Sequence, residues 1–223
     1  FLAAYVRTVS QRPGINRFVS GQKVFARNNI EIALTIKKDM QLNAPDTCVK
    51  AVFEPSATAE EVYETLNAVV MREKEKSALD SSFDSTARLL RFIPGLLLKF
   101  TVWLLSLLDY FGLLPKKLLA VSPFHGSLVI TSMGSLGIPP IYHHLYDFGN
   151  VPVFLAFGAK RSQNELQRDG AVVERRYIDY NVVTDERICD GFYYASALKY
   201  IKQLLKNPAV LSERPAEIIE DID

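Results

Sequence analysis

The sequence contains few of the residues that build disulfide frameworks or metal centres. Its 223 residues include two cysteines, Cys48 and Cys189, and three histidines. Two cysteines cannot form the framework of a disulfide-rich domain, and the histidines lack the spacing of a zinc finger. We therefore expect no metal site and a reducing, cytoplasmic environment.

An excess of charge of one sign is also missing. The chain has 26 Lys and Arg residues against 25 Asp and Glu, a formal net charge of +1. Its overall charge therefore gives no general attraction to nucleic acid or to acidic lipid. With 48% hydrophobic and 23% charged residues, the composition is typical of a globular domain with a real core. No charged-then-apolar leader follows Phe1, so we expect no signal peptide.

The chain has no apolar run long enough for a membrane span. Its most apolar stretch is 89–114, where the longest uncharged run, 100–108, is about half of the ~20 residues that a span needs. The polar positions fall on one narrow stripe: Arg91, Gly95, Lys99, Ser106 and Asp109. This pattern predicts an amphipathic helix with a wide apolar face. We expect that face to pack against the protein's own core or a sister subunit; the alternative is peripheral contact with a membrane surface.

Hydrophobic periodicity predicts a mixed α/β chain. Helices are expected over 1–11, after the capping-box pair Thr58 and Glu61, and from Gly191 to Asn207. Strands are expected over 23–26, 31–37, 48–53, 127–131, 151–158 and 172–184.

Local turn signals predict how some of these strands pair. Asn28-Asn29 predicts that the strand over 31–37 pairs with the one over 23–26, and Asp169-Gly170 predicts a hairpin turn before the last strand. Because no Pro/Gly/Ser-rich linker divides the chain, we expect one domain over residues 1–211 and a loose acidic tail over 212–223.

Few side chains can carry acid–base chemistry near neutral pH. The histidines are His125, His143 and His144, and the adjacent pair cannot share the i,i+4 geometry of a helical zinc site. No P-loop, G-x-S-x-G or G-x-G-x-x-G motif is present, and Gly134 and Gly137 provide only a glycine-containing turn. Composition and spacing alone thus predict an α/β domain without assigning a reaction.

Four stretches resemble a known family. Residues 185–191, Asp-Glu-Arg-Ile-Cys-Asp-Gly, resemble the D-H-R-x-x-D-G motif of 2-oxoacid dehydrogenase acyltransferase (E2) catalytic domains. Their last residues with Phe192 resemble the C-D-G-F of chloramphenicol acetyltransferases, which share that fold. Residues 130–137 (ITSMGSLG) are similar to the family's T-I-S-S/N-x-G-x-x-G turn. Residues 151–158 and 29–36 are similar to its A-I-L-G-V-G and N-I-G-I-A-V strands.

The resemblance covers nearly the whole chain except an apolar helical insertion at about 80–124. The family's domain begins one or two elements earlier, so its amino-terminal elements are expected to be missing from this sequence. The resemblance implies a chloramphenicol acetyltransferase-like two-layer α/β fold, with a large mixed sheet covered by helices. It also implies a trimer with active sites between subunits.

The resemblance also implies the chemistry. In this family an acyl group passes between coenzyme A and a thiol or hydroxyl acceptor, with the motif histidine as general base. A Ser or Thr on the strand matching 129–132, here Ser132, hydrogen-bonds the oxyanion. The motif aspartate, here Asp190, holds the loop through a buried ion pair; its alternative interpretation is an N-terminal helix cap. The resemblance assigns no residue of this chain to coenzyme A and implies no metal.

This chain departs from the motif at the decisive position, because Glu186 replaces the histidine. Ordinary pKa values place proton transfer from a thiol uphill by about 2 pKa units for His and about 4 for Glu. The difference is roughly 3 kcal/mol, more than about a hundredfold in driving force. Two hypotheses follow: an acyltransferase that uses Glu186 or a recruited histidine, or a catalytically silent trimeric binding or scaffold protein, with membrane-surface association as one form of it.

Overall fold

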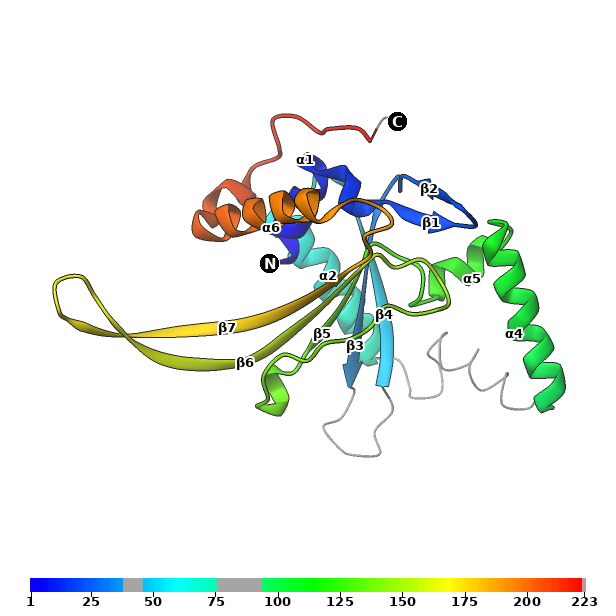
Figure 1. The fold of residues 1–223 in the computed structure, drawn as a ribbon, viewed down its shortest axis with the longest axis horizontal. Coiled ribbons are helices and arrows are strands. Elements are labelled where there is room, and N and C mark those ends of the chain that lie inside the picture. The colour runs from blue at the N-terminus through cyan, green and yellow to red at the C-terminus, as the bar shows by residue number, and fades with distance from the viewer. Residues whose placement is uncertain (38–45, 76–93, 222–223) are drawn as a thin grey trace.

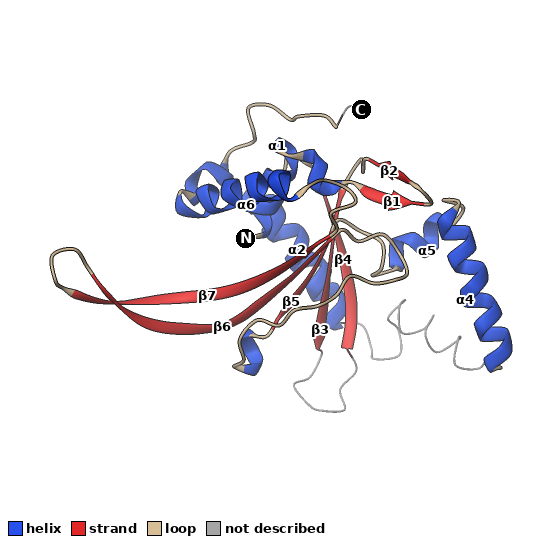
Figure 2. Cartoon of the chain, viewed as in Figure 1, coloured by secondary structure: helices blue, strands red, loops and turns tan. Residues whose placement is uncertain are grey.

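The computed structural model describes residues 1–37, 46–75 and 94–221. Their main feature is a five-stranded sheet in the order β4-β3-β5-β6-β7 (Figures 1 and 2). The strands are β3 (Ile30–Lys37), β4 (Asp46–Phe53), β5 (Leu128–Ser132), β6 (Val153–Leu166) and β7 (Val172–Thr184). The central pairs β3–β5 and β5–β6 are parallel, and the outer pairs β3–β4 and β6–β7 are antiparallel, so the sheet is mixed.

Three helices cover one face of this sheet: α1 (Leu2–Gln11), α2 (Ala59–Glu75) and α6 (Gly191–Lys206) (Figure 1). The largest core cluster lies between these layers and draws apolar side chains from all three helices and from strands β3 to β6. A smaller cluster on the other face contains Val129 and Phe154, with Leu145 packed against it. The expected two-layer α/β architecture is therefore confirmed.

Elements with strong local signals form where the sequence predicts them. The capping box at the start of α2 is present: Thr58 N–H donates to Glu61 Oε2 over 2.8 Å, and Glu61 N–H donates to Thr58 Oγ1 over 3.3 Å. Gly170, with φ +85°, makes the turn between β6 and β7. The helix α6 ends at Lys206, just before the predicted stop at Asn207-Pro208.

The predicted pairing of residues 23–26 with residues 31–37 is wrong. Strand β2 (Lys23–Phe25) pairs instead with a short strand, β1 (Phe18–Ser20), and β3 lies between β4 and β5. The reason lies at Gly21, whose φ of +61° is open to glycine and lets the chain turn between Ser20 and its pairing partner Lys23.

The hairpin of β6 and β7 is longer than predicted. Strand β6 extends to Leu166 because its outer residues pair with β7 alone, beyond an irregularity between Phe157 and Lys160. This part of the hairpin is polar and exposed, so its pattern did not predict a half-buried strand. It projects from one side of the molecule (Figure 1).

The acidic tail is not loose up to Asp221. Asp221 accepts hydrogen bonds from the Arg17 guanidinium at 2.6 and 2.8 Å. Ile219 N–H donates to the carbonyl of Ser10 over 2.9 Å, and the Gln11 side chain donates to the carbonyl of Glu217. Residues 217–219 of the tail thus run beside the end of α1.

The apolar segment forms helix α4 (Gly95–Tyr110), followed by α5 (Lys116–Val121), whereas residues 89–93 lie outside the described ranges. No residue of α4 is buried. We expected the apolar face to pack against the protein's own core or against a sister subunit. The first of these expectations is wrong, because α4 stands away from the sheet of its own protomer (Figure 1). Within residues 1–37, 46–75 and 94–221, no helix has the length and apolarity needed to cross a bilayer.

Candidate functional site

The motif loop joins β7 to α6 and is braced at several points. Asp190 is the N-cap of α6, and its carboxylate accepts a hydrogen bond from Tyr193 N–H over 2.8 Å. Asp185 accepts 2.6–3.0 Å hydrogen bonds from the Arg187 guanidinium. Tyr194 Oη donates to the carbonyl of Asp185 over 3.1 Å. The loop therefore has a fixed conformation, in which the predicted helix-cap interpretation of Asp190 is confirmed; its ion pair stays a prediction.

Charge pairing within the loop shifts the pKa of Asp185. Burial alone would raise this pKa, but hydrogen bonds from the side chain and backbone of Arg187 and the charge of its guanidinium outweigh that effect and lower it. Asp185 thus holds the Arg187 side chain in place on the loop that also carries Glu186.

Glu186 is exposed on this loop and lies over the start of α6. Its Oε1 lies 3.6 Å from where a Cβ would stand on Gly191. The amino end of a helix carries partial positive charge, which attracts a carboxylate. The Glu186 side chain is exposed, and within the described parts of the chain no hydrogen bond or ion pair engages its carboxylate.

Ser132 lies far from this loop in the same protomer. It is the last residue of β5, and its exposed hydroxyl accepts a hydrogen bond from Gly134 N–H over 3.3 Å. Ser132 pairs with Phe157 on β6, whereas the end of β7 pairs with Val153, at the start of β6. With these pairings, strand spacings place Ser132 and Glu186 about 20 Å apart. One protomer therefore does not bring the two residues together.

A cavity of about 490 Å³ borders the motif loop without reaching Glu186. It lies between the β1–β2 turn, the end of α4 and residues 145–149, and its polar lining includes Asp109, Tyr146, Asp147 and Arg187. Since Glu186 does not line it, this cavity alone does not form the predicted acyl-transfer channel.

The cysteines have the properties of unreactive thiols. Burial raises the pKa of Cys48 to about 11, although the charge of Lys50 lowers it in part. Burial also raises the pKa of Cys189, and the hydrogen bond with Tyr194 opposes this only partly. Across the described ranges, no three His, Cys, Asp or Glu side chains are grouped so that they could hold a metal ion.

The three histidines occupy different environments. The ring of His143 stacks on Phe154 with centroids 4.3 Å apart, and burial, assisted by the charge of His144, lowers the pKa of His143. His125 is only 2% exposed. Its Nδ1 lies 2.8 Å from Ser122 Oγ and its Nε2 lies 3.0 Å from Asp109 Oδ1.

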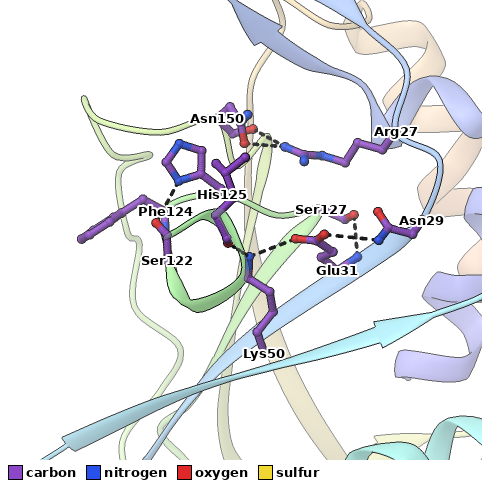
Figure 3. A network of polar contacts seen from close by, with 10 residues as sticks. Arg27, Asn29, Glu31, Lys50, Ser122, Phe124, His125, Ser127 and Asn150 are labelled. Carbon is purple, nitrogen blue, oxygen red and sulfur yellow. Dashed lines mark hydrogen bonds and ion pairs between the residues drawn. The ribbon is translucent and has the colours of Figure 1, made fainter. Parts of the chain in front are cut away.

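The arrangement of Ser122, His125 and Asp109 is one that sequence reasoning missed. It has the residue types of a hydrolytic triad, but Ser122 is buried and its oxygen also accepts a hydrogen bond from Phe124 N–H. The hydroxyl is therefore held within the protein, and the three residues connect the end of α4 to the loop before β5. Figure 3 shows His125 pointing toward Ser122 within this loop.

A second polar network beside it fixes the same loop (Figure 3). The Lys50 ammonium donates to Glu31 Oε2 over 2.9 Å and to the carbonyl of Leu119 over 2.7 Å. Glu31 N–H donates to Ser127 Oγ, and burial lowers the pKa of Lys50 against the opposing effect of Glu31. These paired groups hold the connection from α5 to β5 and therefore the position of the strand that carries Ser132.

Comparison with known proteins decides the fold. No known protein family and no curated protein matches the chain by sequence. Among solved structures, the dihydrolipoamide acetyltransferase (E2p) of Azotobacter vinelandii is similar over 94% of this chain and 68% of its own, with TM-score 0.52 and 13% identity. This chain has the fold of an E2 acetyltransferase core.

Two further structures are similar at lower scores. A probable dihydrolipoamide acetyltransferase from Listeria monocytogenes matches 92% of this chain and 70% of its own, with TM-score 0.48 and 15% identity. A chloramphenicol acetyltransferase matches 92% and 75%, with TM-score 0.43 and 13% identity. In the Azotobacter enzyme, a serine, a histidine and an asparagine have roles in the catalytic mechanism, and the last two are four residues apart.

Proposed function

We propose that this protein is an acyltransferase that moves an acyl group between coenzyme A and a thiol or hydroxyl acceptor. One observation carries the proposal: on the E2-core fold, Glu186 and Asp190 have the spacing of the catalytic histidine and asparagine of the Azotobacter enzyme. Ser132 precedes Glu186 by about as many residues as the serine precedes the histidine there.

In the proposed reaction, Glu186 accepts the proton of the acceptor thiol or hydroxyl as it attacks the thioester carbonyl. The tetrahedral oxyanion takes a hydrogen bond from Ser132 of the partner subunit. Collapse breaks the carbon–sulfur bond, and the leaving thiolate recovers the proton from Glu186. Asp190 is a positioning residue, because its cap on α6 sets the loop that presents Glu186.

The separation of about 20 Å supports a site between copies of the chain. A trimer in which the β5 end of one protomer meets the motif loop of the next would unite Ser132 and Glu186. The trimer, the use of coenzyme A and the cytoplasmic setting all belong to this proposal.

The test measures, by mass spectrometry, the transfer of an acetyl group from acetyl-CoA to dihydrolipoamide. We expect a wild-type rate above background, its loss in Glu186→Ala, and no change in the matched control Glu64→Ala on the exposed side of α2. An undiminished rate in Glu186→Ala would assign the base to another residue, such as the recruited histidine. No transfer with a series of CoA thioesters under excess acceptor would overturn the proposal.

The second candidate is a catalytically silent trimeric scaffold of the same fold. The observation that favours it is the carboxylate at the motif position, because a carboxylate repels a developing oxyanion whereas a protonated imidazole attracts it. On this alternative, the wild type and Glu186→Ala have the same background rate while the trimer persists in both.

A further inference from the structure

Helix α4 presents a continuous apolar face that no element in the described part of the chain covers. Leu96 is 87% exposed and Trp103 is 57% exposed. At 100° per residue, seven large apolar side chains fall on this one side of the helix. We call it the α4 face: Leu96, Leu97, Phe100, Trp103, Leu104, Leu107 and Phe111. Exposed contiguous apolar patches of this kind mark interaction sites rather than ordinary surface.

The carboxyl end of α4 is fastened to the body of the protein. Asp109 Oδ1 lies 3.0 Å from His125 Nε2, and the Asp109 carbonyl accepts a hydrogen bond from Ser20 Oγ over 3.1 Å. These contacts turn the acidic side chain of the helix inward. Helix α4 is therefore held away from the sheet by fixed contacts at its carboxyl end (Figure 1).

Among the described residues, the charged side chains of α4 and α5 that form no ion pair are all positive. They are Lys99 on α4 and Lys116 and Lys117 at the start of α5, whereas Asp109 is engaged by His125. The near-neutral charge of the whole chain conceals this local basic character. A second copy of the same surface would bring lysines against lysines, whereas anionic lipid headgroups complement them.

We propose that the α4 face docks on an anionic membrane surface, with the helix lying in the headgroup region. The apolar side chains enter the boundary of the acyl chains, and Lys99, Lys116 and Lys117 contact headgroup phosphates or carboxylates. Tryptophan and tyrosine favour this boundary, where Trp103 and Tyr110 would lie. The inference is independent of acyl transfer, since it rests on α4 and α5 alone.

Trp103 is the single tryptophan of the chain, so intrinsic fluorescence reports on the α4 face directly. We expect vesicles of equal parts phosphatidylcholine and phosphatidylserine to shift its emission to the blue and to shield it from acrylamide. Vesicles of phosphatidylcholine alone should produce a weaker change, and added salt should weaken the response to the mixed vesicles. An emission spectrum that is unchanged by either vesicle would overturn the proposal.

Two variants keep Trp103 as the fluorescent reporter and separate the apolar contribution to vesicle binding from the electrostatic one. Leu96→Ser/Leu97→Ser/Phe100→Ser should lower the bound fraction at limiting lipid by about tenfold or more, because each buried apolar side chain favours partition. Lys116→Glu/Lys117→Glu should remove the preference for phosphatidylserine. The matched control, Tyr63→Ser/Met71→Ser, replaces exposed apolar residues of α2 and should bind like the wild type.

Two outcomes would reject a lipid occupant. If Trp103 is shielded without vesicles and becomes accessible on dilution as the particle mass falls, a second copy covers the α4 face. If the control variant loses vesicle binding as strongly as the α4 variant, binding does not depend on this face. Equal binding to neutral and anionic vesicles would overturn the anionic assignment.

Discussion

Glu186 occupies the position that histidine has in the resembled motif, and this one residue sets the expected rate. An imidazole lies about 2 pKa units closer to a thiol than a carboxylate does, roughly 3 kcal/mol in driving force. Because only part of that driving force appears in a rate, we expect Glu186→His to raise acetyl transfer by about tenfold. Glu186→Gln keeps the shape of the side chain but cannot accept the proton of the acceptor thiol, so its acetyl-transfer rate should fall to background. The assay is the one proposed above; a wild-type rate in Glu186→Gln together with background in Glu186→His would contradict the assigned role.

The two thiols give a second prediction at this scale. A folded-state pKa of about 11 means that the Cys48 thiolate is scarce near pH 8, about one part in a thousand, and forms only as the pH rises toward that value. The pKa of Cys189 is shifted in the same direction. We therefore expect slow iodoacetamide labelling of both thiols at pH 8, with faster labelling of the urea-unfolded chain as the control. Rapid labelling of Cys189 in the folded protein would instead identify it as a nucleophile.

Single residues differ in how far the sequence predicts their roles. The cap at Asp190 is predictable because the rule involves one residue and the backbone three positions later. The contact between Asp109 and His125 is not, because it depends on how a helix end meets a loop that the chain reaches 16 residues later. The separation of Ser132 from Glu186 depends likewise on strand order, which no local pattern contains.

At the scale of elements, the start of α2 depends on its capping box. Thr58→Ala removes the acceptor for Glu61 N–H and should lower the free energy of unfolding by about 1 kcal/mol, whereas Thr58→Ser keeps the hydroxyl and serves as the control. The hydrogen bond from Thr58 N–H is the main cause that lowers the pKa of Glu61. A lowered carboxyl pKa stabilises the fold at neutral pH, and this stabilisation is lost as the pH falls through the lowered value. Urea unfolding at neutral and acidic pH measures both effects; equal stability of wild type and Thr58→Ala at neutral pH would contradict the prediction.

The elements that sequence reasoning misplaced share a physical cause. The Asn28-Asn29 pair is a local turn signal, but the hairpin turn forms at Gly21, between β1 and β2. Strand β3 pairs with β4 and β5, which follow it in the sequence. Helix α4 was predicted as a helix because periodicity is local. What its apolar side contacts depends on the rest of the assembly, and here the protomer leaves it exposed.

At the scale of the whole molecule, the sheet separates the two residues that the proposed reaction would use. Glu186 follows the edge strand β7, Ser132 ends the central strand β5, and the parallel β5–β6 pair places them at opposite ends. On the proposal that Ser132 and Glu186 act together, their site would lie between protomers, and either a two-fold dimer or a closed ring such as a trimer could form it.

This geometry predicts complementation between two inactive variants. Glu186→Ala and Ser132→Ala should each abolish acetyl transfer as pure proteins. When they are unfolded together in equal amounts and refolded, random assembly gives about one quarter of interfaces with both Glu186 and Ser132 of the partner subunit intact. Mixed material should recover about a quarter of the wild-type rate, whereas each variant refolded alone should recover none. If the mixture stays inactive while refolded wild type is active and sediments as a trimer, then both residues act within one protomer. If pure Ser132→Ala is itself active, then Ser132 has no part in the reaction.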